Sequence, residues 1–259
     1  MIMRRTSIVL FGVWLGISAA AADGAKVPAA QEWSWTGPFG HFDAVQLQRG
    51  YQVYKEVCSA CHGMHLLAFR NLSDDGGPGF SETQVKALAA SVQVPSIDDK
   101  GEAATRPGIP ADHFLSPFPN EKAARAANGG ALPPDLSVII KAREGGADYV
   151  YALITGYSDA PPDMAGKMMP GMNYNPYFLN GQIAMPAPLS ADGQVTYAGG
   201  QPPSSKAQMA KDVVAYLTWA SEPKMQERKT MGIKVMAFLL VLSVLLYAAY
   251  KHLWRDIDH

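Results

Sequence analysis

Two apolar runs lie near the ends of the chain, and the longer one is near the C-terminal end. It extends from Val235 to Tyr250, 16 residues without a charge between Lys234 and Lys251. Counted from Met231 it has 20 residues, about enough for a helix to cross a hydrocarbon core of about 30 Å. A buried core helix is the alternative, but the run is apolar on all sides and only a short polar tail follows it. The pattern predicts a transmembrane anchor at residues 230–251 and a tail at 252–259.

The shorter run lies near the other end. Arg4 and Arg5 precede the uncharged stretch Ile8 to Ile17, and the alanines Ala19 to Ala22 follow it. A positive start, a short apolar centre and small residues are the three parts of a secretory signal peptide. An uncleaved anchor helix is the alternative, but it needs a longer run. We predict a signal peptide at residues 1–22 and an exported domain at residues 23–229.

Two amphipathic segments between these runs are predicted to pack against each other. Asp43 is suited to cap a helix that continues through Tyr51 and Tyr54, although its apolar positions form an imperfect stripe. Gly50 costs this helix about 1 kcal/mol relative to alanine, which a close crossing by another helix would justify. The partner predicted for the crossing is Ser205 to Ala220. Its apolar residues on one face are Met209, Val213, Tyr216, Leu217 and Ala220.

The rest of the pattern is rich in loops. Short helices are predicted at Ser81 to Ala90 and Asp148 to Thr155, whereas residues 91–134 and 156–203 are mostly turn residues. The 24 glycines and 19 prolines make 43 of 259 residues, about 17% against an average near 12%. Loops of this length inside a domain usually serve a function or pack around something large. The sequence therefore predicts a mostly α-helical domain with long loop insertions.

The candidate chemistry is concentrated in residues 57–63 (VCSACHG). Cys-x-x-Cys-His is the attachment pattern of a c-type haem, in which each thiol adds to a vinyl group and the histidine binds the iron. A thioredoxin-type redox pair and half of a zinc site also use Cys-x-x-Cys. Neither explains His62, and the chain has only two cysteines, too few to complete a zinc site. Cys58, Cys61 and His62 are predicted to hold one covalent haem c.

The second axial ligand of that iron would decide what the domain does. A methionine closes the site and raises the potential for electron transfer, whereas an open site binds small ligands or supports peroxide chemistry. Among 12 methionines, Met185 stands in a segment stiffened by prolines, Gly181 to Pro188. From the residues alone this choice stays open. The weaker candidates are Met164, Met168, Met169, Met172, His41 and His113.

Charge excludes one class of partner and suggests another. The 22 Lys+Arg against 23 Asp+Glu do not provide the basic surface that nucleic-acid binding demands. Residues 73–112 are locally acidic, with a net charge of −4 from seven acids and three Lys+Arg. Such a segment is usually a solvated loop, but it would also steer a basic protein toward the domain. The acids are Asp74, Asp75, Glu82, Asp98, Asp99, Glu102 and Asp112.

Longer motifs around the cysteines resemble the cytochrome c1 family. Residues 49–62 (RGYQVYKEVCSACH) are similar to its haem segment, and residues 120–137 (NEKAARAANGGALPPDLS) and 210–223 (AKDVVAYLTWASEP) are similar to its later motifs. Shorter matches at residues 106–108, 148–150, 155–157 and 175–178 occur in the same order. The resemblance covers nearly all of the chain after the predicted signal peptide and includes the C-terminal anchor.

The resemblance implies roles for individual residues. Met185 falls where the family places its axial methionine, and Arg143 matches an arginine that contacts a haem propionate, since a guanidinium suits a carboxylate. Some bacterial members carry an extra cysteine pair on the methionine side. This chain lacks that pair, so packing and prolines are expected to stiffen residues 156–185. The other pocket residues implied are Tyr149, Asn128, Pro133 and Pro134.

The resemblance also implies a fold, a function and a location. The fold would be a class I cytochrome c-like haem domain with one C-terminal transmembrane helix. The chain would be a subunit of the ubiquinol:cytochrome c oxidoreductase, the cytochrome bc1 complex, of alphaproteobacterial type, and no enzyme alone. It would pass single electrons from a Rieske iron–sulfur protein to a soluble basic cytochrome c, with cytochrome b and membrane lipid as further partners. Its haem domain would lie in the bacterial periplasm, tethered to the inner membrane.

Two alternative functions stay open at this point. A membrane-anchored monohaem cytochrome c would feed an oxidase or a photosynthetic reaction centre directly. A haem enzyme or sensor would keep an exchangeable sixth site, and binding of cyanide or carbon monoxide would distinguish it from both carriers. Co-purification with a dihaem membrane subunit and an iron–sulfur subunit would separate the two carriers from each other.

Overall fold

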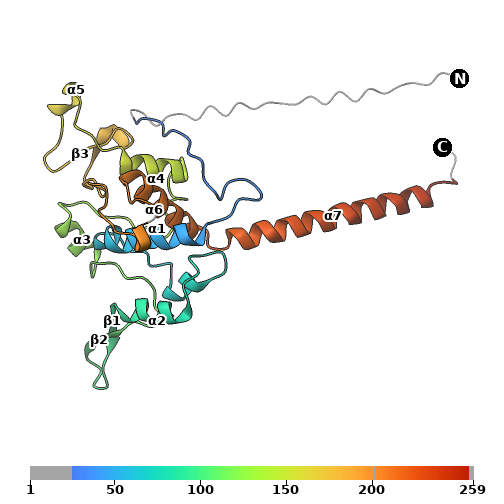
Figure 1. The fold of residues 1–259 in the computed structure, drawn as a ribbon, viewed down its shortest axis with the longest axis horizontal. Helices are drawn as coiled ribbons and strands as arrows, with labels where there is room; N and C mark the ends of the chain where they lie inside the picture. The colour runs from blue at the N-terminus through green and yellow to red at the C-terminus, as the bar shows by residue number, and fades with distance from the viewer. Residues whose placement is uncertain (1–24, 201, 257–259) are drawn as a thin grey trace.

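The computed structural model describes residues 25–200 and 202–256 (Figure 1), so the predicted signal peptide at residues 1–22 lies outside the described residues. This part of the chain is mostly helical, which confirms the prediction of a mostly α-helical domain. It also contains two short antiparallel strand pairs. The strands are β1 (Gln93–Ile97) with β2 (Ala103–Pro107), and β3 (Asn173–Tyr174) with β4 (Gln182–Ile183). The α-helices are α1 (Ala44–Glu56), α2 (Glu82–Ala90), α3 (Glu121–Ala127), α4 (Gly146–Thr155), α5 (Pro162–Ala165), α6 (Lys206–Ser221) and α7 (Met225–Leu253). Single 3₁₀ turns occupy Cys58–Ala60, Phe69–Ser73, Leu179–Gly181 and Ala198–Gly200.

The predicted crossing at Gly50 is confirmed as the packing of α1 on α6. A Cβ at Gly50 would lie 2.0 Å from the backbone oxygen of Asp212 and 2.7 Å from Cβ of Tyr216. Real Cβ atoms do not approach backbone oxygens this closely, so only glycine lets the two helices meet here. The helix-propensity cost of Gly50 is therefore offset by the close approach of α6.

An ion pair closes the same crossing. Nε and Nη2 of Arg49 donate to the carboxylate of Asp212 at 2.9 and 3.2 Å, and Nε2 of Gln208 donates to it at 2.9 Å. Asp212 is fully buried, whereas Arg49 keeps 15% of its side chain exposed. A buried carboxylate is tolerated only when it is paired and hydrogen-bonded in this way. The pair therefore fixes the register of α1 against α6.

Helix α6 is more deeply buried than its sequence pattern predicts. Every residue from Asp212 to Ser221 is buried, not just the single apolar face expected from the stripe. The reason is that α1 and α4 both pack on this helix and an aromatic cluster surrounds it. Within that cluster the ring of Tyr216 lies 5.8 Å from Tyr54 and 5.6 Å from Trp219.

The predicted helix starts are confirmed, but the predicted long loops contain further structure. Asp43 accepts a hydrogen bond from the backbone N–H of Val45, and Ser81 forms a capping box with Gln84. Residues 91–134, expected to be mostly turns, contain the β1–β2 hairpin and α3. Both strands are largely exposed, so they lack the alternating apolar pattern by which half-buried strands are recognised. The hairpin projects from the body of the domain (Figure 1).

The C-terminal apolar run forms one continuous helix, α7, which extends away from the domain (Figure 1). In the described part of the chain it is the one helix long and apolar enough to cross a membrane. Its most apolar window has a mean hydropathy of 2.2, and none of that window is buried against the domain. The helix has 29 residues and thus begins before the predicted span. These findings are consistent with a single membrane pass near the C-terminal end.

Candidate metal centre

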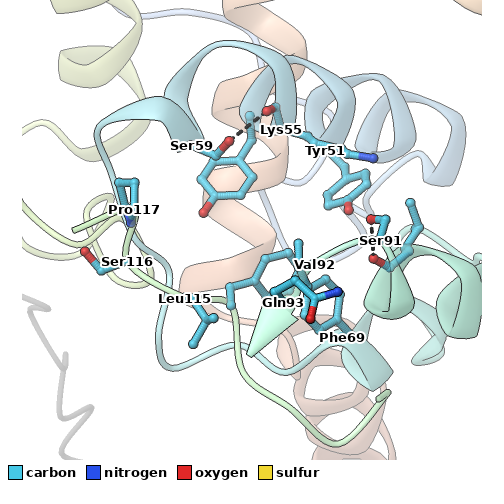
Figure 2. A pocket seen from close by; sticks show the side chains of 13 residues that line it. Tyr51, Lys55, Ser59, Phe69, Ser91, Val92, Gln93, Leu115, Ser116 and Pro117 are labelled. Atoms are coloured by element: carbon cyan, nitrogen blue, oxygen red, sulfur yellow. Dashed lines mark hydrogen bonds between the residues drawn. The ribbon is translucent and has the colours of Figure 1, made fainter. Parts of the chain in front are cut away.

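The two cysteines lie on a tight turn directly after α1. The carbonyl of Cys58 accepts hydrogen bonds from the backbone N–H of Cys61 at 3.1 Å and of His62 at 2.9 Å. Ser59 ties the turn back to the helix, since its hydroxyl donates to the carbonyl of Lys55 at 2.7 Å (Figure 2). Both thiols are free, with Cys58 half-buried and Cys61 exposed. Burial, and then the neighbouring Cys61, raise the pKa of the Cys58 thiol to about 12.

The ring of His62 is held in one orientation by a backbone carbonyl. Its Nδ1 lies 2.7 Å from the carbonyl oxygen of Pro134. Because a carbonyl only accepts, Nδ1 must carry the proton, and the lone pair of the ring is on Nε2. Burial lowers the pKa of His62, while the bond to Pro134 opposes that shift. A neutral imidazole with a fixed tautomer and an available Nε2 is suited to bind a metal.

The segment that carries the Pro134 carbonyl is itself clamped to the residues after the histidine. The carboxylate of Asp135 accepts from the backbone N–H of His65 at 2.8 Å and lies 2.6 Å from its ring Nδ1. The backbone N–H of Leu136 donates to the carbonyl of Gly63 at 2.9 Å. Burial alone would raise the pKa of Asp135, but hydrogen bonds from Ser137 and His65 outweigh it and lower that pKa. Sequence reasoning missed Asp135, which follows two prolines and gives no pattern of its own.

Met185 lies in a second set of contacts, on the side of α4. Its carbonyl accepts a hydrogen bond from the hydroxyl of Tyr157 at 3.0 Å and from the side-chain amide of Asn173 at 3.4 Å. The methionine is half-buried. Two donors on its backbone fix the position from which the thioether extends. Tyr157 and Asn173 were not predicted as site residues, although Tyr157 belongs to one of the short matched motifs.

The loop before Met185 is fastened to α4 by a fully buried asparagine. The side-chain amide of Asn175 donates to the carbonyl of Leu153 at 2.7 Å, and its Oδ1 accepts from the backbone N–H of Tyr177 at 3.0 Å. The ring of Tyr177 packs so closely on Gly156 that a Cβ there would lie 2.5 Å from it. The prediction that packing and prolines alone stiffen residues 156–185 is therefore incomplete, because hydrogen bonds through Asn175 and Tyr157 also hold this loop.

Arg143 and Tyr149 lie next to the Met185 group. The positive charge of Arg143 lowers the pKa of Tyr149, although burial outweighs it and raises that pKa overall. Burial, and then Tyr149, raise the pKa of Tyr157 well above its usual value. Arg143 thus acts electrostatically on Tyr149, and Tyr149 acts on Tyr157. The guanidinium of Arg143 is exposed, and within the described ranges it donates to the neighbouring carbonyl of Ala142 at 3.0 Å, so it is accessible to an anionic group.

Among the described residues, no side-chain hydrogen bond links Asn128 or Pro133 to the residues around His62 or to those around Met185. The side-chain amide of Asn128 donates to the carbonyl of Ala124 at 2.7 Å and so caps the C-terminus of α3. Pro133 is half-buried, whereas Pro134 is exposed and contributes its carbonyl to His62. In the described ranges no hydrogen bond connects the His62 group with the Met185 group. The two groups are related through α6, on which α1 and α4 both pack.

Cavities do not locate the site by themselves. One cavity of about 320 Å³ lies between α1, α2 and residues 114–117, with Tyr51, Tyr54, Phe69 and Phe114 among its lining residues (Figure 2). Another, of about 550 Å³, lies between α4, residues 187–192 and the start of α6. Neither is lined by His62 or Met185. The site is identified by its donor set instead.

That donor set fits a c-type haem. Two free thiols one turn apart suit thioether bonds to the two vinyl groups, and the Nε2 lone pair of His62 suits the iron. A zinc ion fits less well, because no cluster of three or more His, Cys, Asp or Glu side chains that could hold a metal ion is found in residues 25–200 and 202–256. The thioether of Met185, the methionine predicted as the second ligand, is of the type found in electron-carrying cytochromes.

Comparison with known proteins agrees with this donor set. Residues 33–257 match the model of the Cytochrome C1 family. The chain is 47% identical to cytochrome c1 of Rhodospirillum rubrum over 98% of both chains. It is 49% identical to the mitochondrial heme protein cytochrome c1-2 of Solanum tuberosum, over 85% of this chain and 82% of that one. It is also 47% identical to the cytochrome b/c1 of Bradyrhizobium diazoefficiens, over 92% of this chain and 37% of that longer protein. A match of this extent settles the family: this chain belongs to the cytochrome c1 family.

Proposed function

We propose that this chain is the haem-bearing electron-transfer subunit of a cytochrome bc1 complex, passing single electrons from a Rieske iron–sulfur protein to a soluble cytochrome c. As a member of the cytochrome c1 family, it carries one covalently bound c-type haem. The observation that carries the proposal is the fixed tautomer of His62 in the Cys-x-x-Cys-His turn, within a chain that matches the family over residues 33–257. The chain is a redox subunit and not a catalyst alone.

The residues of this chain would hold and shield the haem. Cys58 and Cys61 would form the two thioether bonds, and His62 and Met185 would bind the iron from opposite sides. The haem, when bound, supplies the one-electron redox chemistry. The Pro134 carbonyl keeps Nε2 of His62 unprotonated, and Tyr157 and Asn173 hold the backbone of Met185. A pair of fixed ligands leaves no open position, which suits electron transfer and not ligand exchange.

We infer that Arg143 and Tyr149, which lie on the Met185 side, face the propionates of the haem. Arg143 is exposed beside Tyr149, and it would hold a propionate through charge-assisted hydrogen bonds. Tyr149 would add a hydroxyl donor to the same carboxylate. Pro133 and Pro134 would line the ring near His62. Asn128 uses one N–H of its side-chain amide to cap α3, so the other N–H and Oδ1 are left for the pocket.

The partners follow from the relatives and from charge. A relative named cytochrome b/c1 contains a region 47% identical to this chain, which supports association with cytochrome b. For the acceptor we propose a basic cytochrome c that approaches the acidic residues of the 73–112 segment. Arg106 pairs with Asp112 at 2.7 Å and lowers the pKa of that acid to about 2. The two opposite charges cancel, so this pair adds no net charge to the segment. Six acids and two lysines remain, and the net charge of −4 is unchanged.

The location rests on the two apolar runs. We propose that α7 crosses the bacterial inner membrane once, with residues 23–229 in the periplasm and 252–259 in the cytoplasm. The signal peptide predicted at residues 1–22 would export the domain to the compartment where haem c is attached. The family match and the long apolar helix α7, the one such helix among the described residues, support this arrangement.

Purification of the tagged chain from its native membrane tests the proposal. We expect a dihaem cytochrome b and an iron–sulfur subunit to co-purify, and the isolated assembly to reduce cytochrome c when quinol is added. A chain with a normal haem spectrum that elutes without these two subunits, and is reduced directly by another donor, would favour a separate membrane-anchored carrier instead.

A further inference from the structure

The loop between the N-terminal segment and α1 contains the most exposed large apolar side chain in the described part of the chain. Phe39 is 80% exposed, whereas its aromatic neighbours Trp33, Trp35 and Phe42 are all buried. The two tryptophans stack with their ring centroids 4.8 Å apart, and Phe42 packs on Trp35 at 5.5 Å. The loop thus buries three aromatic rings and leaves the fourth, Phe39, free to contact a surface outside the domain.

The fold of the loop holds it in one shape. The backbone N–H of His41 donates to the carbonyl of Ser34 at 3.0 Å, and Thr36 donates to the carbonyl of Trp33 through both its N–H and its hydroxyl. Gly40 packs so closely that a Cβ there would lie 2.1 Å from the carbonyl oxygen of Thr36. Phe39 is therefore presented by a closed turn and not by an extended strand.

A lysine ties this turn to the anchor helix. Nζ of Lys229 donates to the carbonyl of Trp35 at 2.6 Å and to that of Gly40 at 3.1 Å. The two carbonyls flank Phe39 in sequence, so the turn is fastened beside the first turns of α7. In Figure 1 the loop before α1 extends in the same direction as α7 and lies next to its beginning.

The position of Lys229 sets the height of the turn relative to a membrane. The apolar span begins at Met231, which is 56% exposed. Lys229 precedes it by two residues, which is about 3 Å of helix rise. Lysines at such positions reach the headgroup region, and aromatic side chains are favoured there. Lys224, just before the helix, and Arg228 in its first turns pair with Glu227 and Glu222, so Lys229 supplies the unbalanced positive charge at this level.

We propose that residues 33–42 form a second membrane contact, in which Phe39 enters the interfacial region of the lipid bilayer beside α7. The partner is a lipid surface, chosen because the turn is hydrogen-bonded to the start of the membrane-spanning helix. The contact would give the domain two points of attachment and so limit its rotation about α7. This inference rests on the proposed membrane crossing of α7 and does not depend on the haem or on the acceptor cytochrome.

Quenching by brominated lipid tests the contact in the full-length haem protein. Phe39→Cys is labelled with a thiol-reactive nitrobenzoxadiazole dye and placed in phosphatidylcholine nanodiscs, with or without bromine near the top of the acyl chains. Wild-type protein, treated in parallel, reports any labelling of Cys58 and Cys61. Leu240→Cys within α7 is the lipid-exposed reference, and Asp99→Cys in the β1–β2 turn is the aqueous reference.

We expect brominated lipid to reduce the emission at position 39 at least twofold, to reduce it less at position 240, which lies deeper in the span, and to leave position 99 unchanged. Emission at position 39 that responds like position 99 would overturn the proposal. Loss of quenching when cytochrome b is bound would also overturn it, since a protein partner would then cover Phe39. Adding Lys229→Met should reduce the quenching at position 39, and unchanged quenching would overturn the role given to that lysine.

Discussion

Gly50→Ala tests the packing on which the metal centre is built. Helix α1 ends just before the cysteine turn, and its crossing with α6 fixes where that turn lies. The new Cβ would lie 2.0 Å from the backbone oxygen of Asp212. A backbone atom cannot rotate away as a side chain can, so the two helices must separate by more than an ångström. The separation would also stretch the Arg49–Asp212 ion pair in the same crossing.

Two opposing terms set the magnitude of this effect. Alanine favours a helix over glycine by about 1 kcal/mol. Overpacking of a closely packed site costs about 1–3 kcal/mol, and a backbone clash belongs at the upper end of that range. We expect a net loss of about 2 kcal/mol in the free energy of unfolding, which for a domain of this size lowers Tm by about 4–8 °C.

Thermal unfolding of the haem-loaded protein, followed by far-UV circular dichroism, measures this change. Gly166→Ala is the matched control, because a Cβ there meets nothing within 4 Å and the backbone already has a helical conformation. We expect the control to be unchanged within 1–2 °C, about the error of such a comparison. A Gly50→Ala protein with the same or a higher Tm would refute the reasoning, since helix propensity would then outweigh the contact with α6.

Three further changes probe the site and its surface. The double variant Cys58→Ala/Cys61→Ala should contain no covalently attached haem on a denaturing gel stained for haem, and normal staining would refute the attachment. Tyr157→Phe removes one donor to the Met185 carbonyl, worth about 1 kcal/mol, so the Tm of the haem-loaded protein should fall by about 2–4 °C; a decrease no larger than that of the exposed control Tyr247→Phe would refute the role. Neutralising Asp75, Asp99 and Glu102 together should slow electron transfer to a basic cytochrome c at low salt and flatten its salt dependence in stopped-flow experiments. An unchanged salt slope would exclude these acids from the docking surface.

The helical frame could be predicted because its signals are local. Asp43 and Ser81 cap helices where the sequence predicts them, and Gly50 marks the crossing with α6. The β1–β2 hairpin could not be predicted, because its side chains are mostly exposed and its stability comes from backbone pairing. The all-round burial of α6 was also missed, since it depends on α1 and α4 packing from two sides.

The site shows the same division between local and distant information. The Cys-x-x-Cys-His spacing identifies three of its residues from seven positions of sequence. The carbonyl of Pro134 meets the His62 ring across 72 residues, and the hydroxyl of Tyr157 meets Met185 across 28. Such long-range contacts leave no periodicity in the chain. Among 12 methionines the surrounding prolines favoured Met185, but they left the choice open, and the family resemblance was needed to select it.

The central claim is that His62 and Met185 close both axial positions of a covalently held haem iron. Exposure of the reduced full-length protein to carbon monoxide tests it most directly, with Met185→Leu measured beside the wild type and covalent haem confirmed in both. We expect no shift of the absorption spectrum in the wild type and a clear shift in the variant. Immediate binding of carbon monoxide by the wild type, or a Met185→Leu protein that remains closed to it, would show that Met185 does not close the sixth position.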